Sequence, residues 1–190
     1  MGPRARGRSP AAGDTVTSGD LRRLVVLRHA KSAWPDGVAD HERPLAPRGR
    51  RDAPAAGRWL REVGCVPDLV VCSTAGRTRQ TWDLVSDELD ATTPVTHDAR
   101  LYRASAGELL GVVRDIPARV RTLMLVGHNP GVQDLVLMLA GEADGYALEQ
   151  TRAKFPTSAI AVLCLHGPWP DLEPGAARLT EMVVPRGAKP

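Results

Sequence analysis

The stretch LVVLRHAKS, residues 24–32, runs four apolar residues directly into an arginine and a histidine. A short apolar run bounded by polar residues is typical of a strand that is buried on both faces, because such a strand has no side exposed to water. Arginine and histidine both donate hydrogen bonds to anions, and Arg28 and His29 follow the run at once. The stretch therefore predicts a central strand whose carboxyl end carries two anion-binding side chains.

Other apolar runs of strand length alternate with helical patterns along the chain. Strands are expected at 23–28, 68–73, 122–128, 158–167 and 178–185, with a weaker one at 94–98. Helices are expected at 47–63, 76–89, 105–115 and 130–141. This alternation predicts a single-domain, three-layer α/β/α sandwich with a mostly parallel sheet.

The first and last of these helices carry signals at specific positions. In the last helix, Asn129 is suited to the N-cap, Pro130 to the first helical position and Gly141 to the end. In the first helix, Pro54 either kinks the helix or marks its first turn, and the sequence leaves both possibilities open.

The charge of the chain is concentrated at its beginning. The 190 residues carry a formal net charge of +3, all of it within residues 1–23, where five arginines outnumber two aspartates. Because residues 24–190 are neutral overall, we expect no nucleic-acid binding by the folded domain. The expected organisation is a basic, disordered tail at 1–21, one domain at 22–185 and a short tail at 186–190.

Composition also bounds the location of the protein. No apolar run reaches the roughly 20 residues that a membrane span needs, and the N-terminus lacks the apolar segment of a secretion signal. Cys65, Cys72 and Cys164 lie in apolar surroundings without a C-x-x-C spacing, which favours buried thiols in a reducing compartment. We therefore expect a cytoplasmic protein that does not bind membranes. The four tryptophans are expected to serve packing.

Polar side chains follow three of the expected strands. Arg28 and His29 follow the first, Ser73 the second, and His128 and Asn129 the third. In open α/β sheets, ligands bind at the carboxyl ends of the parallel strands. We therefore expect these side chains to converge at one edge of the sheet and to bind an anion.

Five segments of the sequence carry distinctive polar motifs. They are, in chain order, RHAKS (28–32), DHERPLAPRG (40–49), STAGRTRQT (73–81), VGHNPG (126–131) and FPTSAIA (155–161). Together they resemble the signatures of the histidine phosphatase superfamily, the phosphoglycerate mutase-like clan, and in particular its short SixA-like branch of phosphohistidine phosphatases. The resemblance spans about residues 22–185, and five motifs in order are far more specific than any one. Two positions depart from the pattern. The third segment lacks the usual proline, and Ala46 replaces the usual Ser or Thr cap before the first helix.

The resemblance implies a phosphoglycerate mutase-like fold and a catalytic group of four residues. His29 would be the nucleophile and form a covalent phosphohistidine that water later hydrolyses. Arg28 and Arg77 have planar guanidinium groups suited to phosphate oxygens, and their charge should disfavour protonation of the His29 ring. His128 would donate to another oxygen or to the leaving group. Motif register favours Arg77 over Arg79, which is expected to be solvated.

Four more residues are candidate substrate contacts: Lys31, Ser32, Asn129 and Arg43, the last of which, together with Asp40, is also expected to brace the loop over the pocket. Phosphoryl transfer consists mainly of positioning and charge stabilisation, and two arginines supply that charge. Because the sequence shows no carboxylate cluster or H-x-H spacing, no metal and no cofactor are expected.

The sequence thus favours a metal-independent phosphatase whose partner is a phosphorylated protein, with phosphohistidine as the reacting group, or a small phosphorylated substrate. Two alternatives stay open. One is a small-molecule phosphomonoesterase or acyl-phosphatase of the same superfamily, and the other is a non-catalytic phosphate-binding module.

A general acid is harder to identify. Larger members of the clan resemble one another in having a glutamate after the corresponding strand, whereas this sequence has Arg103 there. Glu108 lies further along an expected helix and is interpreted as a solvated residue. Asp36, Asp40 and Glu42 are the substitutes that the sequence offers. Residues 82–127 must complete one helix, a strand, a second helix and the third main strand, which leaves little of the chain for a helical lid, so we expect an open, shallow site.

Overall fold

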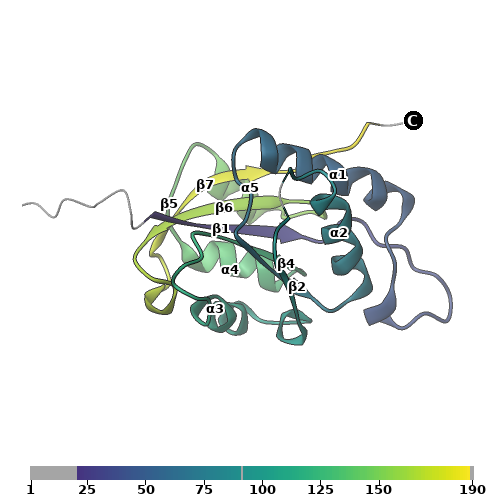
Figure 1. Ribbon diagram of the computed structural model, residues 1–190, viewed down its shortest axis with the longest axis horizontal. Helices are drawn as coiled ribbons and strands as arrows, with labels where there is room; N and C mark the ends of the chain where they lie inside the picture. The colour runs from purple at the N-terminus through teal and green to yellow at the C-terminus, as the bar shows by residue number, and fades with distance from the viewer. Residues whose placement is uncertain (1–20, 91, 189–190) are drawn as a thin grey trace, which may run out of the picture.

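A seven-stranded sheet in the order β3-β2-β4-β1-β6-β7-β5 forms the centre of the computed structural model, which describes residues 21–90 and 92–188 (Figure 1). The strands are β1 (Leu21–Arg28), β2 (Leu69–Ser73), β3 (Val95–Asp98), β4 (Thr122–Gly127), β5 (Ala140–Ala143), β6 (Ile160–His166) and β7 (Ala177–Val183). The helices are α1 (Pro47–Glu62), α2 (Gly76–Ser86), α3 (Ala106–Arg114), α4 (Gly131–Leu139) and α5 (Ala147–Ala153), with short 3₁₀ turns η2 (Asp40–Glu42), η3 (Ala99–Leu101) and η4 (Trp169–Asp171).

Most strands of the sheet run in one direction. β1 is parallel to β4, β4 to β2, and β2 to β3. β6 is antiparallel to both β1 and β7, and β7 is parallel to β5. Only β6 therefore runs against the others within the described ranges, and the carboxyl ends of β1, β2 and β4 meet at the same edge. This confirms the predicted mostly parallel α/β fold.

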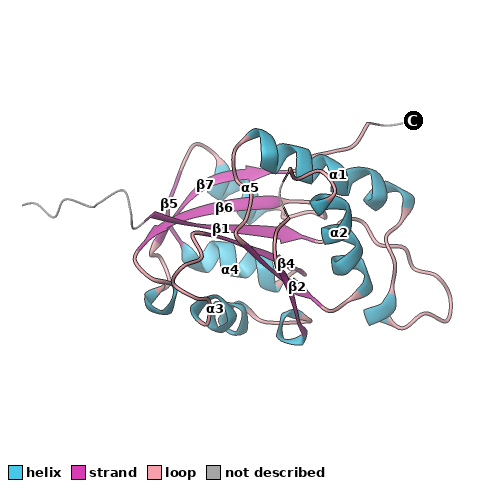
Figure 2. Ribbon diagram, in the orientation of Figure 1, coloured by secondary structure: helices cyan, strands magenta, loops and turns pink. Residues whose placement is uncertain are grey.

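The sheet separates two apolar cores because successive side chains of a strand point to opposite faces. In β1, Val25 and Leu27 pack with α1 and α2, whereas Leu24 and Val26 pack with residues of α3 and α4. All four side chains are fully buried, as the continuous apolar run predicts. Figures 1 and 2 show α1 and α2 over the near face of the sheet and α4 behind it.

The sequence-based prediction of secondary structure was wrong at the end of the helix that follows β4. The expected helix 130–141 ends at Leu139, and the chain continues at once into β5. The segment Ala-Gly-Glu-Ala has no β-branched or aromatic residue, so nothing local indicates a strand. Pairing with β7 creates it, and Gly141 allows the close approach, since a Cβ there would collide with the carbonyl of Gly175.

Helix ends also differ in detail from expectation. Pro130 is the N-cap of α4 rather than its first residue, and Asn129 uses its side chain elsewhere. Pro54 lies inside α1, which begins at Pro47 after Ala46 without a side-chain cap. The missing cap is thus confirmed, and α1 accommodates Pro54 beyond its first turn.

The ends of the chain were predicted to be tails. Residues 1–20 and 189–190 lie outside the described residues, so the predicted tail at 1–21 and the domain boundaries stay predictions, although Leu21 is the first residue of β1. Arg186 binds the buried carboxylate of Asp52 in α1 at 2.7 Å, and the Gly187 amide donates to the other oxygen of Asp52 at 3.2 Å.

Within the described residues, no helix is long and apolar enough to cross a membrane.

Candidate active site

The carboxyl ends of β1, β2 and β4 border a small cavity of about 180 Å³. All eight residues that the sequence predicts as catalytic or substrate-contacting line it, whereas Ser73 and the candidate general acids Asp36, Asp40 and Glu42 do not. The lining residues are Arg28, His29, Lys31, Ser32, Trp34, Arg43, Arg77, His128, Asn129 and Thr157. The side chains come from segments that are distant in sequence, and the parallel order of the strands brings them together.

His29 is held in a single orientation. Its Nδ1 lies 2.7 Å from the carbonyl oxygen of Ala30, and a carbonyl only accepts, so Nδ1 carries the proton. The Ala30 amide in turn donates to Thr81 Oγ1 at 3.0 Å, which anchors this part of the chain on α2. The neutral ring therefore has its lone pair on Nε2, which is the atom a nucleophile needs.

Burial keeps the His29 ring neutral. It lowers the pKa of His29 to about 3, although the hydrogen bond to Ala30 acts in the opposite direction. The charges of His128, Arg77 and Arg28 lower this pKa further. The sequence-based prediction attributed the neutral state of the His29 ring to the charges of the arginines, whereas removal of the ring from water is the larger cause of the lowered pKa.

His128 lies beside His29, with 5.2 Å between the two ring centroids. Its Nε2 shares a hydrogen bond of 2.8 Å with Ser73 Oγ, and its Nδ1 is buried without a partner among the described residues. Burial, followed by the charge of Arg77, lowers the pKa of His128 to about 3. When the Ser73 hydroxyl donates to Nε2, the single ring proton is on Nδ1, where it is available to donate a hydrogen bond to a ligand.

A second loop supports the end of β1. Arg28 donates to the carbonyl of Phe155 at 2.8 Å, and burial lowers the pKa of its guanidinium. The amide of Ser158 lies 3.2 Å from the carbonyls of both Arg28 and His29. Ser158 has a φ of 63°, a conformation that is rare outside glycine and that aims its N–H at both carbonyls. The FPTSAIA segment thus positions Arg28 and His29.

Arg77 is oriented by one acidic residue. Its Nη1 donates to the carbonyl of Asp40 at 2.6 Å, and its Nη2 lies 3.3 Å from the Asp40 carboxylate. Tyr102 also donates to this carboxylate at 2.6 Å, and Arg43 at 2.9 Å. Hydrogen bonds from Tyr102 and Arg43 hold the pKa of Asp40 well below its usual range. Asp40 is therefore an anionic brace and a poor proton donor.

Tyr102 was missed by the sequence-based prediction. Its ring packs edge-on against His128, with centroids 5.6 Å apart, and against His41 at 4.8 Å. It is the residue immediately before Arg103, where the clan pattern suggested a missing acid. Tyr102 therefore supports the site from outside the cavity lining, through His128 and Asp40. Glu108 caps α3 in a capping box with Ser105 and is exposed.

Arg43 is bound to protein through each of its side-chain nitrogens. Nε donates to the carbonyl of Ala33, Nη1 to Asp40 and Nη2 to Ser32 Oγ, at 2.9, 2.9 and 2.6 Å. Its guanidinium also lies 3.1 Å from the ring centroid of Trp34. Two roles were predicted for Arg43: to contact the substrate and to brace the loop over the pocket. These contacts favour the second role. Trp34 is 73% exposed, so the expectation that it serves packing was wrong.

The remaining candidates occupy the rim. Lys31 is exposed, and Asn129 donates from Nδ2 to Gln133 Oε1 at 2.9 Å and to the carbonyl of Phe155 at 3.0 Å. Arg79 is exposed and lies 3.9 Å from Glu42, as expected for a solvated arginine. The described residues contain no group of three or more histidine, cysteine or acidic side chains placed to hold a metal ion.

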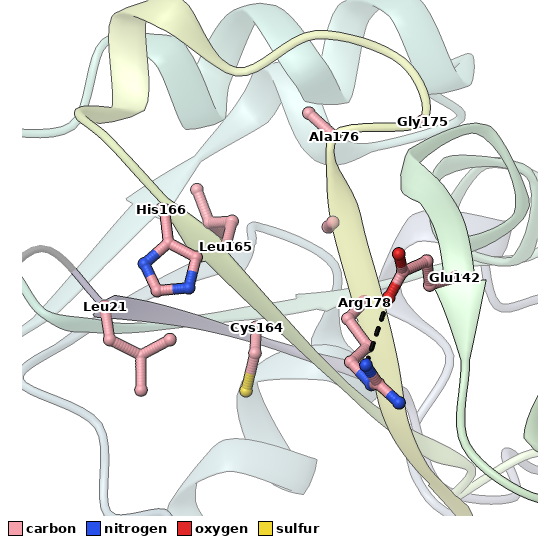
Figure 3. A pocket seen from close by; sticks show the side chains of 9 residues that line it. Leu21, Glu142, Cys164, Leu165, His166, Gly175, Ala176 and Arg178 are labelled. Atoms are coloured by element: carbon pink, nitrogen blue, oxygen red, sulfur yellow. Dashed lines mark hydrogen bonds and ion pairs between the residues drawn. The ribbon is translucent and has the colours of Figure 1, made fainter. Parts of the chain in front are cut away.

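A larger cavity of about 510 Å³ lies at the other end of β1, where Leu21, Cys164 and His166 border it (Figure 3). The ion pair between Glu142 and Arg178, at 3.0 Å, neutralises two of its charged groups. The catalytic motifs all lie at the opposite end of the sheet, so the smaller cavity is the candidate active site.

Replacing Asp40 with asparagine is expected to lower kcat/KM by about tenfold, because a charge-assisted hydrogen bond contributes on the order of 1.5–3 kcal/mol. Arg77 would keep the carbonyl of Asp40 and lose the carboxylate. The measurement is turnover of p-nitrophenyl phosphate and of an alkyl phosphate. A positioning role predicts equal losses with both, whereas a larger loss with the alkyl ester would make Asp40 a general acid. Asp83→Asn, an exposed change on α2, is the matched control.

Acid is expected to destabilise the protein through its two buried histidines. Their folded-state pKa values of about 3 lie below the unfolded value near 6.5, so the unfolded chain binds more protons between these limits. Stability therefore falls as the pH falls through that window. At pH 5 the loss is on the order of 2 kcal/mol for each histidine. Urea unfolding at pH 7 and pH 5 should show a smaller loss for His29→Gln than for wild type, and equal losses would contradict this origin.

Comparison with known proteins gives a consistent result. The family model of the histidine phosphatase superfamily (branch 1) matches residues 24–132. An uncharacterized protein of Mycobacterium tuberculosis strain H37Rv is 48% identical over 162 residues, which cover 84% of this chain and 100% of that protein.

Two solved structures have the same fold. One is the proposed phosphohistidine phosphatase SixA of Nakamurella multipartitia, with a TM-score of 0.77 and 35% identity over 87% of this chain and 96% of that chain. The other is the proposed phosphohistidine phosphatase SixA of Agrobacterium tumefaciens, with a TM-score of 0.72 and 27% identity over 86% of this chain and 98% of that chain.

Proposed function

This chain belongs to the histidine phosphatase superfamily, and from that membership we propose that it removes phosphoryl groups from protein phosphohistidine through a covalent intermediate on His29. The similarity to SixA-like structures supports a phosphatase. One observation carries the mechanism: the His29 ring is neutral, its proton is fixed on Nδ1 by the Ala30 carbonyl, and Nε2 is left to attack.

In the first step, Arg28 and Arg77 bind the phosphoryl oxygens, and Nε2 of His29 attacks the phosphorus. The new N–P bond forms as the bond to the leaving nitrogen or oxygen breaks, and the leaving group departs with a proton that it already carries or as an anion that accepts a hydrogen bond from His128. In the second step, water attacks the phosphorus of the phosphohistidine, which releases inorganic phosphate and restores His29. The guanidinium groups stabilise the charge on the equatorial oxygens in both steps.

The expected partner is a protein that carries phosphohistidine. Between α2 and β4, the described residues form β3, η3 and α3 and no further helix. A chain segment without an additional helix to cover the cavity supports an open approach to it. A small phosphorylated molecule is the alternative substrate, and the cavity of about 180 Å³ limits how much of it beyond the phosphoryl group can be enclosed.

The proposal predicts that the protein dephosphorylates a phosphohistidine peptide at an unchanged rate in excess EDTA. The two arginines supply the positive charge that divalent metals supply in many phosphoryl-transfer enzymes. The measurement is release of inorganic phosphate with and without EDTA. Activity that is lost in EDTA and restored by Mg²⁺ or Zn²⁺ would overturn the metal-independent mechanism. Binding of phosphate without turnover of any phosphorylated compound would favour the non-catalytic alternative.

A further inference from the structure

Trp34 is an exposed aromatic residue at the mouth of the candidate active site. It is 73% exposed and lines the same cavity as His29, Arg28 and Arg77. An indole is a large apolar surface, and leaving it in water forgoes the free energy that burial would supply. Packing in the core therefore does not explain why a tryptophan stands at the rim.

The indole is held in place from one side. The guanidinium of Arg43 lies 3.1 Å from its ring centroid, a close cation–π contact. Arg43 is itself fixed by Ala33, Ser32 and Asp40, so the platform beneath the ring is rigid. With one face on Arg43 and most of the residue exposed, the opposite face of the indole is open to solvent.

The size of the cavity determines which part of a substrate meets this face. A volume of about 180 Å³ corresponds to about six water molecules at roughly 30 Å³ each. A phosphoryl group beside His29 fills about half of that space. The group to which the phosphorus is bonded therefore lies against the remaining lining residues, which include Trp34 at the mouth. The mouth is where the open indole stands.

We propose that Trp34 is a specificity-determining residue that stacks on a planar leaving group, of the imidazole or aryl class, while the phosphoryl group occupies the cavity. This assignment rests on the proposed function for its reaction, since a phosphohistidine presents an imidazole ring at that point. A protonated imidazole gains further from the indole, because tryptophan is the best aromatic partner for a cation. An alkyl phosphate presents no ring and gains nothing comparable.

The test separates ring recognition from turnover by using non-hydrolysable anions. Phenylphosphonate and methylphosphonate share a head group and differ in the ring, and calorimetry on the full chain gives the Kd of each. Wild type should bind phenylphosphonate about tenfold more tightly, in the range that stacking on an aromatic side chain gives. Trp34→Ala should remove this preference and leave the Kd of methylphosphonate unchanged, whereas Trp34→Phe should keep part of it.

Val38→Ala is the control on the same loop, since Val38 is exposed and outside the cavity lining. It should leave both Kd values unchanged. An equal preference for the phenyl compound in wild type and Trp34→Ala would overturn the proposal. Loss of the preference in Trp34→Ala, together with failure of wild type to dephosphorylate a phosphohistidine peptide, would uphold the stacking role and reject phosphohistidine as the substrate.

Discussion

Replacing His29 with alanine is expected to lower kcat for p-nitrophenyl phosphate by about 10⁴-fold or more, because removal of a catalytic nucleophile disables both chemical steps. Nε2 of His29 is the atom freed for attack by the hydrogen bond from Nδ1 to Ala30. The His29 ring is neutral at pH 7 because it is buried, so no neighbouring base has to remove a proton from it before it attacks. Arg28, Arg77 and His128 would remain and bind the substrate, so the loss should fall on kcat more than on KM.

The covalent intermediate gives a second readout of the same prediction. Rapid quenching during turnover should show intact protein whose mass is increased by one phosphoryl group, and the label should be labile to acid and stable to base. His29→Ala should show no label. His166→Ala changes an exposed histidine at the far end of the sheet and should be labelled like wild type. Labelling that persists in His29→Ala would refute the assignment of the nucleophile.

The central part of the fold is readable from the sequence because local and tertiary signals agree there. The run from Leu24 to Leu27 has no polar side, and the structure buries it fully on both faces. The edge strand β5 has no such signal, since its four residues become a strand only through pairing with β7. Sequence patterns predict elements that bury their own apolar residues, and they miss elements that neighbours create.

The candidate site likewise has some features that the sequence predicts and others that it does not. Motifs predicted the four central residues, which all line one cavity. They did not predict that Tyr102 would share the Asp40 carboxylate with Arg43 and Arg77, because these contacts join residues that are 62 and 37 positions apart from Asp40. They also did not reveal that Trp34 is exposed, since a tryptophan in a loop is equally compatible with packing and with recognition.

Selectivity for the leaving group is the second large effect that we expect. A general acid contributes about 10²–10⁴-fold when the leaving group needs a proton. None of the described residues that line the cavity is a carboxylic acid. Asp40 is held anionic by its hydrogen bonds with Tyr102 and Arg43, and Glu108 caps α3. His128 remains, and because its pKa of about 3 leaves it neutral at pH 7, it can donate a hydrogen bond to the leaving group but is a poor source of a proton.

The enzyme should therefore turn over a phosphohistidine peptide and p-nitrophenyl phosphate with a kcat/KM about 10²-fold or more above that for 3-phosphoglycerate. A protonated imidazole and a nitrophenolate leave without further proton transfer, whereas an alkoxide needs a proton. The preference should persist in kcat for Trp34→Ala, because stacking acts on binding and proton supply acts on bond breaking. Comparable kcat/KM values for all three substrates would mean that a general acid operates in this site, and would move the function to a small-molecule phosphatase.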